Sequence, residues 1–152
     1  MKPSLRVGDK FCHEFTIGEN KTVPALYPES AQFQKMPHVF ATGYFVGLLE
    51  WACIELLAPH YEEGEGSLGT HIDISHVAPT PPGHTVVVDA TLTQIDGRSF
   101  WFDVEANDND GLIGKGRHQR AAVFWDKFKD RVAKKSHNLT AKLAAQTPLT
   151  SL

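Results

Sequence analysis

The sequence has little cysteine, no surplus of basic residues and no long hydrophobic run, and each shortage excludes a class of protein. Its two cysteines, Cys12 and Cys53, lack the CxxC spacing of zinc and redox sites, so we expect reduced thiols and no metal. Lys and Arg number 15 against 18 Asp and Glu, and this net charge of -3 argues against a general nucleic-acid binder. No segment has the apolar core of a secretory signal or the length to cross a bilayer. We therefore expect a cytoplasmic protein that binds neither membrane nor nucleic acid.

The length of 152 residues suits one domain whose core needs no disulfide for stability. With 41% hydrophobic and 22% charged residues, the composition is typical of a globular protein. We expect this domain to span residues 1–128. The lysine- and alanine-rich tail at 129–152 predicts a short helix or a partly disordered segment that frays before Pro148.

The stretch from Phe40 to Pro59 is the most apolar part of the chain and predicts a core helix. Its bulky side chains cover nearly every direction around the axis, whereas a surface helix shows one apolar stripe. We therefore expect this helix to be buried. Thr42 stands just before the apolar run, where a hydroxyl normally caps the first turn.

Glu50 interrupts this helix between Leu49 and Trp51. An ionised carboxylate without a partner is costly to bury, so a carboxyl group kept at such a position is a candidate acid, base or nucleophile. The alternative is that Glu50 points outward between its bulky neighbours.

Five segments alternate apolar and polar residues, which is the pattern of a half-buried strand. They span residues 10–17, 68–77, 85–95, 99–106 and 112–125. One strand before the helix and four after it predict an α+β hotdog fold, in which a curled antiparallel sheet wraps around one long buried helix. A single protomer would leave sheet edges bare, so we expect a homodimer.

The segment at residues 19–39 carries several prolines among apolar side chains and predicts a packed flap. Such segments are often lids over a site, and covering a bare edge of the core is an equally good explanation.

Histidines on two predicted strands are candidates for a site. His76 falls on the apolar face of the 68–77 strand, where a histidine is usually a hydrogen-bonded core residue and a chemical role is the alternative. In the last strand, paired small residues leave room over one face, so His118 and Arg120 can border a cavity.

Five motifs together resemble the fluoroacetyl-CoA thioesterase family of hotdog thioesterases, over nearly the whole chain from Arg6 to about Phe128. The motifs are TVPALYPES at 22–30, FATGYFVGLLEWAC at 40–53, GEGSLGT at 64–70, HVAPTPPG at 76–83 and IGKGRHQRA at 113–121. The resemblance implies hydrolysis of a short or small-acyl CoA thioester, without a cofactor.

The resemblance also implies a catalytic set of Thr42, Glu50 and His76, with Gly69 and Arg120 at the substrate. Glu50 would activate water or attack the carbonyl, His76 would shuttle protons, and Thr42 would orient water or the carboxylate. The backbone amide near Gly69 would face the carbonyl oxygen. Thr42 and Glu50 are eight positions apart, about 12 Å along a helix. Either Thr42 therefore lies on a bend before the helix, or the site combines groups from two protomers.

The lid carries one departure from the family. The member specialised for the fluorinated substrate looks as though it uses aromatic residues there, and this sequence matches with Phe33 but has Met36 at the second position. A flexible thioether fills a gap differently from a ring.

Two other functions compete with thioester hydrolysis. An acyl-CoA-binding or sensing module on the same fold would bind acyl-CoA saturably and release no thiol. A hydratase would need an acid/base pair suited to adding water to an enoyl group, and no motif beyond the general presence of Asp and His supports it.

Overall fold

The computed structural model describes residues 1–146. Its elements follow the chain in the order β1 (Lys10–Thr16), η1 (Glu19–Lys21), α1 (Val23–Leu26), η2 (Phe33–Lys35), α2 (Thr42–Leu57), η3 (Ala58–His60), β2 (Glu65–Ile74), β3 (Thr85–Asp96), β4 (Ser99–Asp108), β5 (Gly111–Phe124) and α3 (Trp125–Gln146). The three η elements are single turns of 3₁₀ helix.

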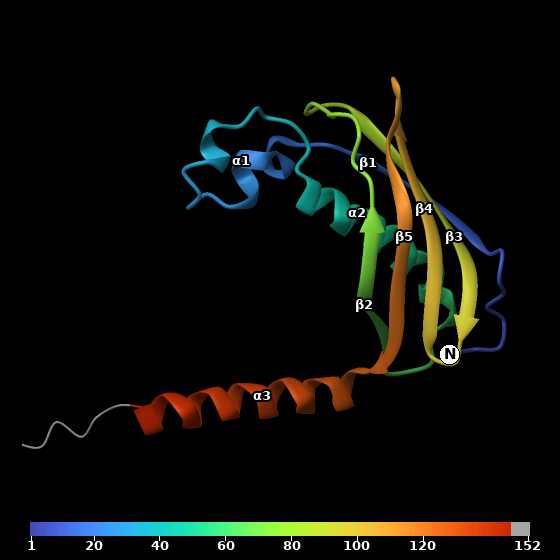
Figure 1. Ribbon diagram of the computed structural model, residues 1–152. Helices are drawn as coiled ribbons and strands as arrows, with labels where there is room; N and C mark the ends of the chain where they lie inside the picture. Colours follow the sequence, from blue (N-terminus) through green and yellow to red (C-terminus); the bar gives the residue numbers. More distant parts are fainter. Residues whose placement is uncertain (147–152) are drawn as a thin grey trace, which may run out of the picture.

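The five strands form one sheet in the order β1-β3-β4-β5-β2, and every neighbouring pair is antiparallel. The sheet curves around α2 (Figure 1). Strands β1 and β2 lie at its two edges, so each has one side without a strand partner among residues 1–146. This arrangement confirms the predicted antiparallel sheet around one long helix.

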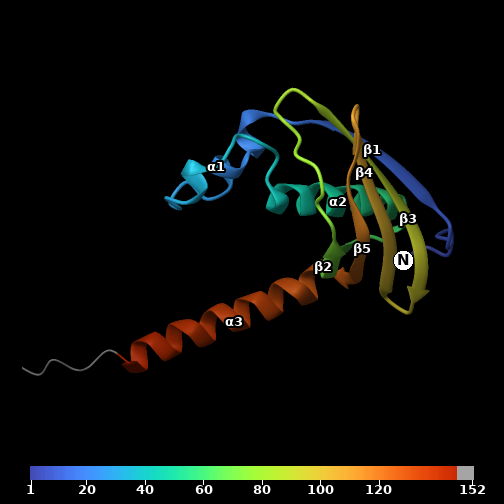
Figure 2. The same ribbon diagram turned by 45° about the horizontal axis from the view of Figure 1, so that its top comes forward.

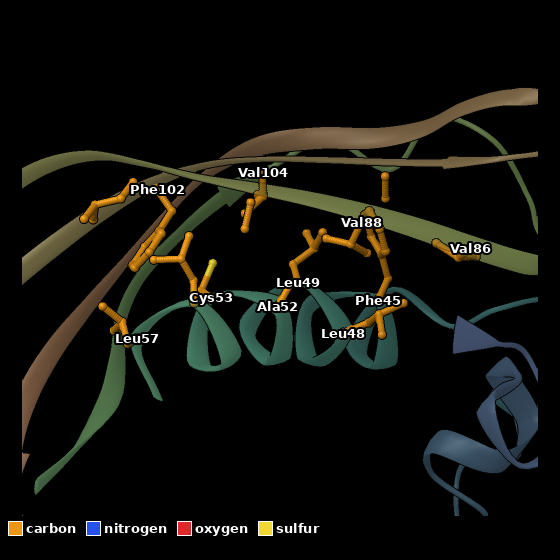
Figure 3. Packing of buried hydrophobic residues seen from close by; sticks show 14 of the residues in the cluster. Phe45, Leu48, Leu49, Ala52, Cys53, Leu57, Val86, Val88, Phe102 and Val104 are labelled. Carbon is orange, nitrogen blue, oxygen red and sulfur yellow. The ribbon is translucent and has the colours of Figure 1, made fainter. Parts of the chain in front are cut away.

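Helix α2 buries one face against the sheet. The buried residues of this face are Phe45, Leu48, Leu49, Ala52, Cys53, Leu56 and Leu57. Figure 3 shows Leu49 and Ala52 pointing from α2 toward Val88 and Val104 of the strands. The opposite face contains Gly43 and Gly47 and exposes 42% of Trp51. The expectation that α2 is buried on all sides is therefore wrong for a single chain, because the sheet covers only one side.

The predicted lid folds over the N-terminal end of α2. An isolated bridge between Thr22 and Phe40 joins the two ends of the lid. Helix α1 lies against the first turn of α2, so closely that a Cβ on Gly43 would approach the side chain of Leu26 to 2.9 Å. The Tyr44 hydroxyl donates to the Ala25 carbonyl at 3.3 Å. These contacts hold the segment in place without a long regular element.

Helix α3 is longer than the short tail helix we expected. It starts at Trp125, whose ring lies over Gly66 of β2, and runs for 22 residues, none of them buried. It projects away from the sheet in both Figure 1 and Figure 2. With six Lys and Arg and two Asp residues, α3 carries a net charge of +4, which leaves -7 on the rest of the chain. The predicted fraying before Pro148 lies outside the described residues.

Replacing Gly116 with Ala should destabilise the fold by separating β2 from β5. Gly116 pairs with Ile74, and a Cβ there would overlap the Asp73 carbonyl oxygen and approach the Ile74 Cα to 2.7 Å. Both neighbours are backbone and cannot rotate aside. We expect the free energy of unfolding to fall by about 1–3 kcal/mol, the usual cost of overpacking. Urea denaturation of the two proteins measures it, and equal midpoints would contradict the expectation.

Candidate active site

The predicted site residues gather in two clusters, and the first is at the N-terminal end of α2. Thr42 is the first helical residue and Ala41 is the N-cap, so the expectation that Thr42 caps the helix is wrong. Its hydroxyl Oγ1 instead lies 2.8 Å from Nδ1 of His76. A hydrogen bond thus joins the start of α2 to the segment that follows β2.

His76 lies two residues beyond the end of β2, on the side of the chain that faces the core. Its ring is 4.7 Å from the ring of Phe45. Burial lowers the pKa of His76 below its ordinary value of 6.5, so the ring is neutral at pH 7. Its Nε2 is buried and has no hydrogen-bond partner among the residues that the structure describes. This nitrogen is therefore a buried polar atom whose hydrogen-bonding capacity is unused within the described residues.

A surface pocket of about 330 Å³ opens beside this pair, and Met36 of the lid lines it together with Thr42 and His76. Met36 is 45% exposed. Phe33 is not part of the lining and packs against Tyr27 within the lid, with ring centroids 5.9 Å apart. Only one of the two predicted lid residues therefore meets the Thr42 pair.

The second cluster surrounds Glu50, two turns further along α2. Its Oε1 accepts a hydrogen bond from Nη1 of Arg120 at 3.2 Å and lies 3.7 Å from Nε2 of His118. The Glu50 side chain is 35% exposed, so it is neither fully buried nor directed into open solvent. Its charge is balanced by the Arg120 guanidinium rather than left unpaired.

Gly69 lies against this carboxylate. A β-bulge interrupts the pairing of β2 with β5 between Gly69 and His71. A Cβ at Gly69 would overlap Oε1 of Glu50 and approach Cε1 of His118 to 3.2 Å. Only a residue without a side chain lets the backbone come this close to Glu50.

Arg120 is 3% exposed and is held by β2 as well as by Glu50. Its Nε donates to Oγ of Ser67 at 2.8 Å, and its Nη2 donates to the Ser67 carbonyl at 2.8 Å. Nη1 lies 3.2 Å from Nε2 of His118. Ser67 and His118 are absent from the predicted site, although the glycine spacing in the last strand had placed His118 beside Arg120 at a cavity.

The two clusters do not meet within one chain. Thr42 and Glu50 belong to the same continuous helix, so about 12 Å of rise separates them. The alternative in which Thr42 lies on a bend before the helix is wrong, because Thr42 is already helical.

Two other kinds of site have no support here. Burial raises the pKa of Cys53 to about 12, so its thiol stays protonated and is a poor nucleophile. Within residues 1–146, no group of three or more His, Cys, Asp or Glu side chains is arranged to hold a metal ion. No helix in that range is long and apolar enough to cross a membrane.

Comparison with known proteins connects this geometry to one family. The family model described as fluoroacetyl-CoA-specific thioesterase matches residues 21–126. The fluoroacetyl-CoA thioesterase of Streptantibioticus cattleyicolor is 49% identical over 136 residues, which cover 90% of this chain and 98% of that protein.

Solved structures agree with this relationship. A fluoroacetyl-CoA-specific thioesterase variant in complex with fluoroacetate and CoA is 51% identical, with a TM-score of 0.80 over 82% of this chain and 99% of that chain. A hypothetical protein of Thermus thermophilus, a thioesterase superfamily member, has a TM-score of 0.81 at 25% identity, over 91% of this chain and 98% of that chain. The chain therefore belongs to the fluoroacetyl-CoA-specific thioesterase family, which confirms the hotdog fold and the thioester hydrolase activity predicted from the sequence.

Proposed function

We propose that this protein hydrolyses the CoA thioester of a short or small acyl group, with Glu50 as base or nucleophile. The observation that carries the proposal is the position of the Glu50 carboxylate, which is hydrogen-bonded to Arg120 and lies against the bare backbone of Gly69. A thioester carbonyl placed next to Gly69 would be within reach of this carboxylate. The family relationship supports the same substrate class.

Glu50 can act in two ways. It either removes a proton from an attacking water or attacks the carbonyl itself to form a transient anhydride. In both routes the carboxylate must be oriented toward the reacting atom, and the hydrogen bond from Arg120 orients it. The backbone amide near Gly69 would stabilise the oxyanion that forms on the carbonyl.

His76 and Thr42 would handle the proton on the thiol side. A neutral imidazole can accept a proton from water and deliver it to the departing thiolate, and the Thr42 hydroxyl holds the ring through Nδ1. The unpartnered Nε2 is the nitrogen that would exchange the proton.

We further propose that the protein is a homodimer and that each site takes Glu50 from one protomer and the Thr42–His76 pair from the other. The bare β2 edge and the open face of α2, with Trp51 42% exposed, support this assembly. A continuous sheet through two β2 edges would bring the second protomer next to Glu50. The separation of the two clusters within one chain is the reason for combining two chains.

Release of free CoA thiol from a panel of acyl-CoA esters tests the proposed function. We expect turnover of acetyl- and fluoroacetyl-CoA and slower turnover of branched and aromatic esters, in keeping with the substrate of the family. Saturable binding of every ester without thiol release would instead identify a binding module. The ratio of fluoroacetyl- to acetyl-CoA turnover measures what Met36 contributes in place of a ring.

The pH dependence should reflect a neutral His76. Because burial lowers the pKa of His76 below 6.5, the ring becomes half-protonated only at a pH below 6.5. We expect kcat/KM to decrease as the pH falls, with the midpoint of this decrease below pH 6.5. Steady-state thiol release over a pH series measures this profile. An acid limb with its midpoint above 6.5 would contradict a catalytic His76.

A further inference from the structure

His118 lies directly under the Glu50 cluster and has no role in the mechanism so far. It stands two residues before Arg120 in β5, so both side chains lie on the same face of the sheet. Only 1% of His118 is exposed. A buried polar ring at this place must satisfy both of its nitrogens.

The hydrogen bonds of His118 define its tautomer. Nδ1 lies 2.7 Å from the His71 carbonyl oxygen, which can only accept, so Nδ1 carries the proton. Nε2 lies 3.2 Å from Nη1 of Arg120, and a guanidinium can only donate. Nε2 therefore accepts. The bonds run in one consistent direction, from the Arg120 guanidinium to the His118 ring and from that ring to the His71 carbonyl.

The charges around His118 favour the same neutral form. Burial lowers the pKa of His118 below 6.5, and the positive charge of Arg120 adds to this, while the bond to the His71 carbonyl and the Glu50 carboxylate oppose it. A protonated ring would also direct an N–H at Nη1 of Arg120. The ring is therefore an acceptor at neutral pH.

We propose that His118 is a positioning residue, which orients Arg120 and through it the Glu50 carboxylate. This inference rests on the proposed role of Glu50. Ser67 binds Nε and Nη2 of Arg120, and His118 binds Nη1, the nitrogen that contacts Glu50. His118 thus controls the one guanidinium nitrogen on which the carboxylate depends. Its own Nε2 is 3.7 Å from Glu50 and has no proton to donate, so it does not act on substrate.

Two amide substitutions separate the two nitrogens of the ring. In His118→Gln the side-chain oxygen reaches the place of Nε2 and still accepts from Arg120, whereas in His118→Asn the amide reaches only the place of Nδ1. We expect His118→Asn to lower kcat about 10- to 100-fold, the usual effect of a misplaced catalytic group, with little change in KM. His118→Gln should keep kcat within a few-fold of the parent. Thiol release with acetyl-CoA measures both constants.

Each outcome bears on the proposal. Equal kcat values for the parent and both folded variants would overturn it, and so would equal losses in both variants, because a general packing defect would not be rescued by glutamine. Should either variant fail to fold, ¹⁵N NMR of the imidazole in the unaltered protein decides at neutral pH. A proton on Nδ1 alone supports the proposal, and a proton on Nε2 overturns it. This spectrum does not depend on turnover, so it separates failure of the positioning role from failure of the proposed function.

Discussion

Replacing Glu50 with Gln should remove most of the thioester hydrolysis and leave the fold intact. The amide has the shape of the carboxylate, and its oxygen can still accept from Arg120, so the cluster should persist. It cannot, however, take a proton from water or attack a carbonyl. Loss of a general base or nucleophile at a positioned site typically costs about 10²- to 10⁴-fold. Thiol release from acetyl-CoA gives the rate, and circular dichroism with a thermal melt gives the folded state.

Glu55 offers a matched control on the same helix. Its Oε1 accepts from Nε1 of Trp51 at 2.9 Å, and it contacts neither Arg120 nor Gly69 in the described residues. We expect Glu55→Gln to retain the parent rate. Full turnover by folded Glu50→Gln would exclude Glu50 as base or nucleophile and with it the proposed mechanism.

Two inactive variants should restore activity when they form a mixed dimer. If each site takes Glu50 from one protomer and His76 from the other, a dimer of one Glu50→Gln chain and one His76→Ala chain holds one intact site and one doubly altered site. We expect such a heterodimer to show about half the activity of the unaltered dimer, because one of its two equivalent sites is complete. Coexpression with two different affinity tags and sequential purification isolates the heterodimer.

The homodimer of Glu50→Gln chains and the homodimer of His76→Ala chains serve as controls, and both should be nearly inactive. If the site lay within a single chain, each site of the heterodimer would carry one substitution, and mixing would restore nothing. An inactive heterodimer of confirmed composition would therefore contradict the shared site. A monomer in sedimentation velocity would contradict the homodimer itself.

The periodicity of apolar residues and the turn-forming residues were enough to predict the sheet and the core helix, because both signals depend on residues close together in the sequence. Glu50 could be singled out because it lies in the middle of the apolar run, whereas Glu55 lies near its end, where it can reach water. The hydrogen bond between Thr42 and His76 could not be predicted in this way. The pattern suggested that Thr42 caps the helix, but α2 starts one residue earlier, so Thr42 is its first helical residue.

His118 shows what a strand pattern leaves undecided. Alternation places His118 and Arg120 on one face of β5, and the structure confirms that they lie together. The alternation does not indicate which residues of other strands contact His118 and Arg120. Ser67 meets Arg120 from the regular part of β2, and the His71 carbonyl meets His118 just after the bulge between Gly69 and His71. A bulge adds one residue without a clear sequence signal. Long-range pairings of this kind are decided by the whole sheet.

The positive charge of α3 is separated from the negative charge of the rest of the molecule, so the protein has a large electric dipole. A net charge of +4 extends on one projecting helix while the remainder carries -7, although the whole chain is only at -3. Molecules with such a dipole attract one another head to tail in dilute buffer, and dissolved ions weaken that attraction beyond about 10 Å at 0.1 M salt. Moderate salt should therefore increase the solubility of this protein, the behaviour known as salting-in.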